Sequence, residues 1–240
     1  MSWSVPRDFV RVAGPEAAVF LQVQLSQDIE GLEVGAGARS FVLQPQGKVD
    51  AYLRVTRAGA EEFVLDVDAG WGDAVVARLS RFTLRTKADI EVLDGWSCVA
   101  EVIGGALVEA VGPDLAGGDD DLAGYEELRI RAGEPRMGAE IDESTIPAAL
   151  GVVDRAVSFT KGCYTGQELV ARIDSRGGNT PTRLVGVRGL TAAGAPVVVG
   201  GKEVGRVTSA AGDVALALVR REIDLPTESS AGILDRLPLS

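Results

Sequence analysis

The stretch SFTKGCYTGQELVARIDSRGG, residues 158–178, joins a glycine-punctuated turn to an amphipathic segment. Apolar residues recur at helical spacing after Gly166, so we expect a helix that begins near this glycine. The free N–H groups at the start of such a helix point back toward the turn that holds Cys163 and Lys161. The turn is therefore the first candidate for a chemically active site.

Three interpretations of Cys163 follow from these residues. A helix N-terminus and the ammonium of Lys161 would lower the pKa of the thiol and favour a reactive thiolate. The same arrangement could hold an anion, with Gly162 and Gly166 letting the backbone approach it closely. Alternatively, the glycines serve the turn and the cysteine packs as a small apolar residue. The spacing alone leaves all three open.

The composition excludes several kinds of site. The chain has no histidine, which removes Ser-His and Cys-His nucleophiles, an imidazole base and histidine metal ligands. Its two cysteines, Cys98 and Cys163, lie far apart and form no CxxC pair, so we predict neither a disulfide framework nor a self-contained metal site. Cys98 lies in the β-rich run SCVAEV, where we expect it to be buried.

Charge and hydropathy narrow the choice of partners. The formal net charge of −11 argues against nucleic acid or an anionic membrane as a direct partner. No apolar run approaches the roughly 20 residues that a bilayer-spanning helix needs. The N-terminus MSWSVPRDFV lacks the pattern of a signal peptide, so we expect a cytoplasmic protein.

The order of helical and β-rich segments indicates an α+β fold rather than a regular βα alternation. Gly47 is placed for the turn between two strands. We expect helices within 12–31 and 71–84, and strands within 40–55, 61–67, 88–94 and 97–104.

The middle of the chain and its C-terminal part differ in composition from the rest. Residues 112–124 are small and acidic, and we interpret them as a solvated loop, with Asp119, Asp120 and Asp121 at the surface rather than on a cation. After residue 181 short β runs alternate with tight turns, including the hairpin signal Gly200-Gly201. We therefore predict a core over 1–180 and a small antiparallel β-barrel over 181–240.

Residues 158–178 resemble the signature of the YgfZ family, folate-binding proteins related to the T-protein, the aminomethyltransferase of the glycine cleavage system. The resemblance extends to residues 12–32, 43–55, 128–150 and 201–210. It implies two interleaved ferredoxin-like subdomains, a C-terminal β-barrel and a folate site that faces the middle. It also implies a folate-binding accessory role in iron–sulfur cluster assembly or repair, which indirectly supports iron–sulfur enzymes that modify tRNA.

The resemblance also suggests the site. Cys163 would be the reactive thiol, tetrahydrofolate or a derivative the cofactor, and iron–sulfur proteins or assembly factors the partners. Tyr125 would either stack on the pterin or pack in the core. Glu168 could also form an ion pair with Arg172, four residues on. The residues that the resemblance assigns to folate are Tyr125, Arg131, Lys161, Tyr164, Gly166, Gln167 and Glu168.

Two departures bear on the chemistry. Where the T-protein has a paired Asp-Asp, this chain has Ala51 and Tyr52, with Asp50 one residue early and so on the opposite face of the strand. Arg131 stands where the T-protein holds the pterin edge with a glutamate, and an arginine only donates. We therefore rank a tetrahydrofolate-dependent aminomethyl or one-carbon transferase second, and a thiol redox or sulfur-transfer protein that has lost folate third.

Overall fold

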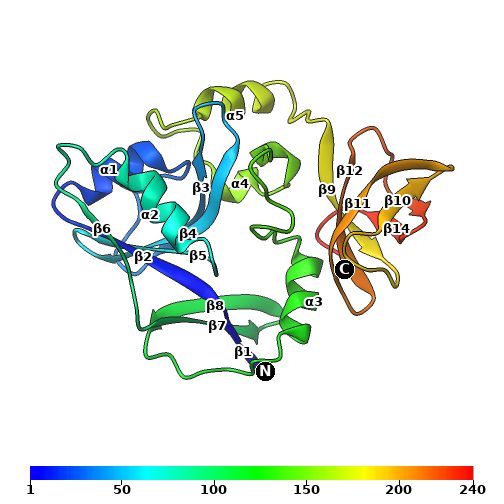
Figure 1. The fold of residues 1–240 in the computed structure, drawn as a ribbon, viewed down its shortest axis with the longest axis horizontal. Helices are drawn as coiled ribbons and strands as arrows, with labels where there is room; N and C mark the ends of the chain where they lie inside the picture. Colours follow the sequence, from blue (N-terminus) through cyan, green and yellow to red (C-terminus); the bar gives the residue numbers. More distant parts are fainter. Residues whose placement is uncertain (240) are drawn as a thin grey trace.

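The computed structural model describes residues 1–239, and three antiparallel sheets form its framework (Figure 1). The largest part of the core belongs to a five-stranded sheet, on the left in Figure 1. Its strands, in spatial order, are β3 (Gly37–Leu43), β4 (Val49–Gly59), β5 (Glu62–Asp68), β2 (Arg7–Ala13) and β6 (Asp89–Val92).

A second, three-stranded sheet is interleaved with the first along the chain. It consists of β1 (Ser2–Val5), β7 (Trp96–Ile103) and β8 (Ala106–Pro113). Ser2 pairs with Glu101 and Val5 with Cys98, so the chain forms one strand here, builds the whole five-stranded sheet, and then returns.

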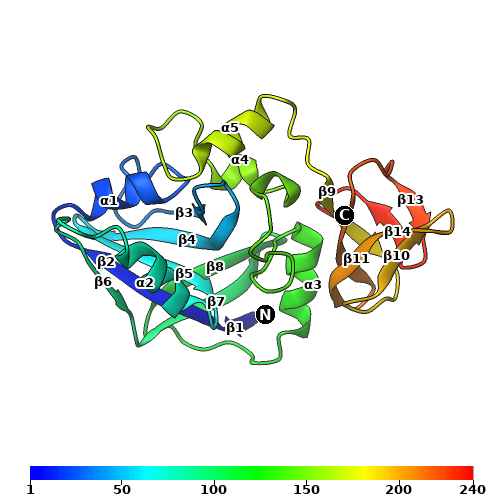
Figure 2. The same ribbon diagram turned by 45° about the horizontal axis from the view of Figure 1, so that its top comes forward.

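Helices cover the sheets and link them to the last third of the chain. Helices α1 and α2 contact the five-stranded sheet, and α5 lies at the top beside the turn between β3 and β4 (Figures 1 and 2). The helices are α1 (Ala17–Gln24), α2 (Gly72–Ser80), α3 (Ala123–Ala132), the 3-10 turn η1 (Pro147–Ala149), α4 (Val153–Ala156) and α5 (Gln167–Asp174).

The turn between β3 and β4 shows why the sequence predicts this hairpin. Gln44 N–H donates to Lys48 O at 2.9 Å, and Gly47 N–H donates to Gln44 O at 2.8 Å. Gly47 has a φ of 78°, a conformation that glycine adopts without the clash that a Cβ would cause. The strand–turn–strand prediction for residues 40–55 is confirmed.

A six-stranded antiparallel barrel follows and packs through β11 and β12 against α3 (Figure 1). Gly200 and Gly201 form the predicted hairpin turn, both with positive φ. The strands, in chain order, are β9 (Thr182–Arg188), β10 (Pro196–Val199), β11 (Lys202–Ala211), β12 (Val214–Arg220), β13 (Thr227–Ser229) and β14 (Gly232–Asp235).

Asp119, Asp120 and Asp121 are exposed, as predicted, but the acidic segment 112–124 is not a loop throughout. Strand β8 runs into it as far as Pro113, and α3 begins at Ala123. Between them Ser4 N–H donates to Asp119 O and Asp119 N–H donates to Ser2 O, which fastens the segment to β1. Among residues 1–239, no group of His, Cys, Asp or Glu side chains is arranged to hold a metal ion.

Helix α2 is shorter than the sequence pattern suggests. It ends at Ser80, so Phe82 lies beyond it and 44% of this residue is exposed. The guanidinium carbon of Arg78 lies 4.6 Å from the centre of the Phe82 ring. This cation–π contact covers one face of the ring, although Phe82 is not buried in the core.

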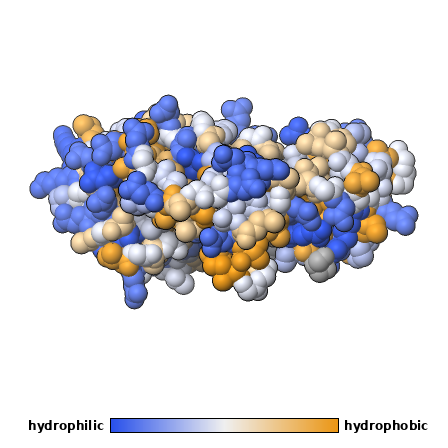
Figure 3. All heavy atoms as spheres, turned by 90° about the horizontal axis from the view of Figure 1, so that it is seen from below, coloured by the Kyte–Doolittle hydropathy of each residue, from blue (hydrophilic) through white to orange (hydrophobic). Residues whose placement is uncertain are grey.

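Polar and charged residues dominate the face seen from below, where hydrophobic residues gather in one area near the middle (Figure 3). None of the helices within residues 1–239 has the length and apolar character that crossing a membrane requires.

Candidate functional site

The turn at residues 161–166, which we call the signature turn, packs on the hairpin between β3 and β4. Gly166, with a φ of 80°, is the residue before α5, so the predicted helix start is confirmed. A Cβ on Gly166 would lie 2.5 Å from Gln44 O and 2.8 Å from Leu43 Cβ, closer than real atoms approach. The glycine therefore lets the start of α5 rest directly on the hairpin turn.

Lys161 fastens the same segment to the end of α1. Its Nζ donates to Leu25 O at 2.8 Å and to Gln27 O at 2.6 Å. Burial lowers the pKa of Lys161 to about 8, and the nearby carboxylates of Asp28 and Glu30 only partly oppose this. Its ammonium is thus engaged by main-chain carbonyl groups rather than directed at a thiol.

The residues after the cysteine include both buried and exposed side chains. Tyr164 belongs to the main core, and burial raises its pKa to about 12. Gln167 Oε1 accepts a hydrogen bond from Tyr164 N–H at 3.3 Å, which supports the first turn of α5. Glu168 is exposed, and in the described part of the chain no ion pair joins it to Arg172.

Cys163 is the exposed member of this turn. It is a free cysteine, and a Cβ on the preceding Gly162 would meet no atom within 4 Å, so the loop is open to solvent here. Cys98 is buried in β7, as predicted, and burial raises the pKa of its thiol. The two cysteines therefore differ in access to reagents and partners, and only Cys163 presents its thiol outward.

Tyr125 occupies a packed position between α3 and the three-stranded sheet. Its ring lies 6.4 Å from that of Trp3, and its hydroxyl donates to Glu109 Oε1 at 2.8 Å. Burial would raise the pKa of Glu109, but Arg39, Arg7, Arg54 and the Tyr125 hydroxyl outweigh it and lower the pKa to about 2. Tyr125 is thus a partner of a buried ionic network and belongs to a different core cluster from Tyr164.

Arg131 faces the barrel. Its Nη2 lies 2.9 Å from Glu127 Oε1 within α3 and 2.9 Å from Asp213 Oδ1 between β11 and β12. The structure therefore brings Lys161, Tyr164, Gly166 and Gln167 together with Cys163, while Arg131 and Tyr125 lie elsewhere.

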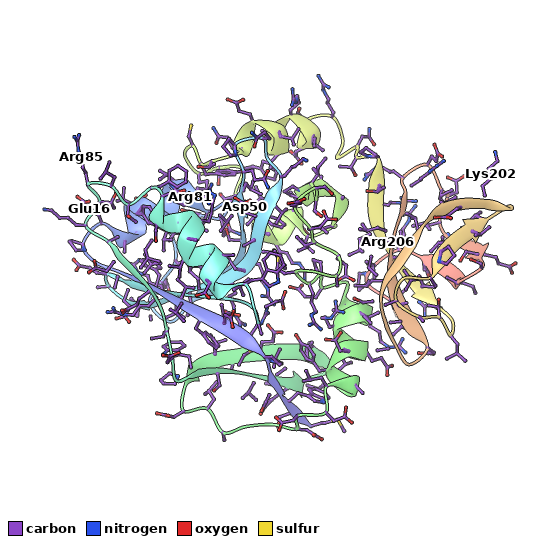
Figure 4. All side chains as sticks on the ribbon, viewed as in Figure 1. Glu16, Asp50, Arg81, Arg85, Lys202 and Arg206 are labelled. Carbon is purple, nitrogen blue, oxygen red and sulfur yellow. The ribbon has the colours of Figure 1, made fainter. Side chains whose placement is uncertain are left out.

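A cavity of about 740 Å³ is lined by the hairpin turn, the start of β4, α2 and residues 137–143. Asp50 and Arg81 both line it, the first from β4 and the second from the end of α2 (Figure 4). The Asp50 carboxylate is ion-paired with Arg78 at 2.8 Å, so Asp50 is not simply an exposed strand residue. Other lining residues include Gln44, Trp71, Met137, Asp142 and Glu143.

Most of this lining carries no local sequence signal. Asp142 accepts hydrogen bonds from Ser144 and Thr145, which lower its pKa, and Met137 N–H donates to Asp68 Oδ2. The lining comes from three segments that meet only in the folded chain. The available signal was that the family-like segments 43–55 and 128–150 contain lining residues such as Gln44, Asp50 and Asp142.

Ala51 and Tyr52, the two residues that stand at the Asp-Asp position, are 3% and 2% exposed. Tyr52 packs on Phe41, and burial together with the Glu134 carboxylate raises its pKa. Neither residue offers a carboxylate, which leaves Asp50 as the acid of this strand nearest the cavity.

Comparison with known proteins identifies the family. Residues 181–232 match the family described as CAF17, C-terminal beta-barrel domain. An uncharacterized protein of Haemophilus influenzae is 30% identical over 71% of this chain and 67% of its own length. The tRNA-modifying protein YgfZ of Edwardsiella ictaluri is 27% identical over 71% of this chain and 65% of its own. The chain belongs to the YgfZ family.

Two further relatives define the fold and the wider group around this YgfZ-family chain. The mitochondrial iron-sulfur cluster assembly factor IBA57 of Mus musculus is 29% identical over 90% of this chain and 76% of its own. The glycine cleavage system aminomethyltransferase T of Bartonella henselae superposes with a TM-score of 0.82 at 19% identity, covering 99% of this chain and 85% of that protein. The fold is therefore that of the T-protein, with its two interleaved ferredoxin-like subdomains and a C-terminal β-barrel.

Proposed function

We propose that this protein is a folate-binding accessory protein in iron–sulfur cluster assembly or repair, and that it indirectly supports iron–sulfur enzymes that modify tRNA. The names of its relatives point to this area of metabolism. The observation that carries the proposal is Cys163, an exposed thiol on a turn that is otherwise fixed by Gly166 and Lys161.

The thiol has the properties that a transient sulfur or cluster ligand needs. It is accessible, it lies just before the N-terminus of α5, and it packs in none of the core clusters. A cluster needs several ligands, and within residues 1–239 Cys98 is buried and remote in sequence. We therefore assign Cys163 as one ligand or one sulfur acceptor, with the remaining ligands supplied by a partner iron–sulfur protein.

The cavity beside Asp50 has the kinds of side chain that a folate site requires. A pterin presents an amino-pyrimidine edge that pairs with a carboxylate, and Asp50, Asp142 and Glu143 supply carboxylates there. Trp71 and Met137 offer apolar surface for a flat ring. Arg81, which has no carboxylate partner in the described chain, can pair with the glutamate part of the ligand. The volume of about 740 Å³ is in the range typical of ligand cavities.

Complementation tests the cellular role. In a strain that lacks this gene, the natural protein should restore the activity of iron–sulfur enzymes and Cys163→Ala should not. Cys98→Ala is the matched control, since it removes the other thiol from a buried strand. Full rescue by Cys163→Ala would refute the role of this thiol.

Calorimetric titration with tetrahydrofolate tests the cofactor and its place. We expect saturable binding that weakens about tenfold or more in Asp50→Asn/Asp142→Asn, by the loss of charge-assisted hydrogen bonds. Arg131→Glu restores the carboxylate of the T-protein at the position assigned by resemblance. Binding that is unchanged by the first variant and strengthened by the second would place the pterin at α3, with Tyr125 and Arg131, instead.

A tetrahydrofolate-dependent aminomethyl or one-carbon transferase is the second candidate, because the Asp50 carboxylate lines the same cavity. Arg78 already engages one oxygen of this carboxylate at 2.8 Å, which favours binding over proton transfer. Turnover of tetrahydrofolate with an aminomethyl donor, lost in Asp50→Asn, would favour the transferase.

A further inference from the structure

A second cavity, of about 600 Å³, separates the barrel from α3 and α4. It shares no lining residue with the cavity at Asp50, so it is independent of the proposed folate site. Arginines enter it from different elements: Arg155 from α4, Arg183 from β9 and Arg236 from the segment after β14. An adjoining cavity of about 450 Å³, which shares Gly151 and Asp154 with it, adds Arg221.

The charge of these arginines is largely uncompensated. Arg155 is paired with Glu134 at 2.6 Å. The guanidinium groups of Arg183, Arg221 and Arg236 form no salt bridge within 4.0 Å in the described part of the chain. This is unusual in a protein with 35 acidic and 24 basic residues, where acidic partners are in excess.

Arg221 and Arg236 also act electrostatically on Arg183. Burial, Arg221 and Arg236 all lower the pKa of Arg183, and Asp224 opposes them only partly. The Nε of Arg183 is buried without a hydrogen-bond partner, although its Nη2 donates to Ile223 O. A buried donor without an acceptor is costly, and an incoming anion would remove both this cost and the mutual repulsion.

The remaining walls are apolar. Leu150, Leu184, Leu225 and Leu237 line the cavity, and Asp154 is the acidic residue among its lining. A cavity lined by both guanidinium groups and leucines suits a ligand with charged groups and a carbon body.

We propose that this cavity, together with the adjoining one, binds a small organic anion of multiple negative charge between the core and the barrel. Arg183 and Arg236 would hold it in the first cavity and Arg221 at the second. Guanidinium forks pair equally well with carboxylate and phosphate oxygens, so the shared chemistry is an oxyanion. The ligand would connect β9 and the C-terminal segment of the barrel to α4 of the core.

Titration of the full chain with pyrophosphate and, separately, with citrate tests the proposal. We expect at least one of them to bind with a 1:1 stoichiometry at low salt and to weaken as sodium chloride rises. Tighter binding of pyrophosphate identifies an organic phosphate, and tighter binding of citrate identifies a polycarboxylate. Binding of neither would overturn the site.

Variants test whether any observed binding takes place in this cavity. Arg236→Gln and Arg221→Gln should each weaken binding about fivefold or more, in line with the loss of a charge-assisted contact. Lys202→Gln makes the same charge change on the outer hairpin of the barrel and should alter binding less than twofold (Figure 4). Equal losses in all three variants would show a general charge effect and overturn the proposal.

Stability without ligand gives an independent readout. Because the arginines repel one another, ligand-free Arg236→Gln should have a Tm at or above that of the natural protein. A Tm several degrees lower would mean that Arg236 stabilises the fold, and this would contradict a binding role.

Discussion

Gly47 and Gly166 face each other at a distance that excludes any side chain. A Cβ on Gly166 would lie 3.2 Å from Gly47 Cα, and a Cβ on Gly47 would lie 2.5 Å from Leu169 Cβ. Two glycine turns, far apart in the sequence, thus form one contact between the hairpin and the signature turn. The position of Cys163 depends on this contact.

Gly166→Ala should destabilise the protein by about 3 kcal/mol. The positive φ of 80° accounts for about 1 kcal/mol, and the overlap with the hairpin for the rest. Gly177→Ala is the matched control, because Gly177 has a φ of 77° but a Cβ there would meet no atom within 4 Å. Urea denaturation measures both, and equal losses would mean that the contact contributes nothing.

Glu109→Gln should cost about 3 kcal/mol at pH 7, because it leaves Arg7, Arg39 and Arg54 without their shared carboxylate. The pKa of Glu109 falls from 4.5 to about 2 on folding, so this stability is fully present above about pH 4.5. It is lost as the pH falls toward 2, where the folded protein also binds the proton.

The difference in unfolding free energy between the natural protein and Glu109→Gln should therefore shrink as the pH falls from about 4.5 to about 2. Glu101→Gln, at an exposed position of β7, should show no such change. A difference that stays constant with pH would contradict the network.

Lys161 should make stability rise with pH in an alkaline window. Its pKa is lowered from 10.5 to about 8 on folding, so between these values the unfolded chain holds a proton that the folded chain has released. Stability relative to Lys161→Met should be lowest below pH 8 and increase from pH 8 to 10. Urea midpoints across this range measure it, with Lys202→Met as the exposed control; a falling difference would contradict the burial of the ammonium.

Cys163 should react with a thiol reagent in the native protein, whereas Cys98 should react only after unfolding. Cys163→Ser should remove the fast phase and change the unfolding free energy by less than about 0.5 kcal/mol, as for an exposed residue. A fast phase that persists in this variant would assign the reactive thiol to Cys98.

Local signals predicted the hairpins and several helices well. Gly47 and Gly200-Gly201 have positive φ angles, a conformation that glycine adopts readily, so these residues indicate the turns by themselves. Gly166 in the same way marks the start of α5. The first strands and α3 were missed. Pro6 separates β1 from β2, and the alternating apolar residues of these two strands were a usable signal. Helix α3, by contrast, has no clear apolar stripe, because its Arg129 pairs with Glu126 and Glu140.

The site could be predicted only in part. The cluster around Cys163 is local, so one stretch of sequence contains it. The Glu109 network and the cavity at Asp50 join residues from distant segments, and no local periodicity encodes such contacts. The domain division at residues 180 and 181 stays a prediction, although β9 begins at Thr182.

The pairing of β1 with β7 also constrains the order in which the sheets can form during translation. Ser2 needs Glu101 as its neighbour, so during translation β1 leaves the ribosome long before its partner exists. The five-stranded sheet, by contrast, can complete most of its hairpins as they emerge. Trp3 and Val5, both buried in the finished fold, therefore lack their partner strand until β7 has been synthesised, so apolar surface of this segment stays uncovered for most of the synthesis of the core.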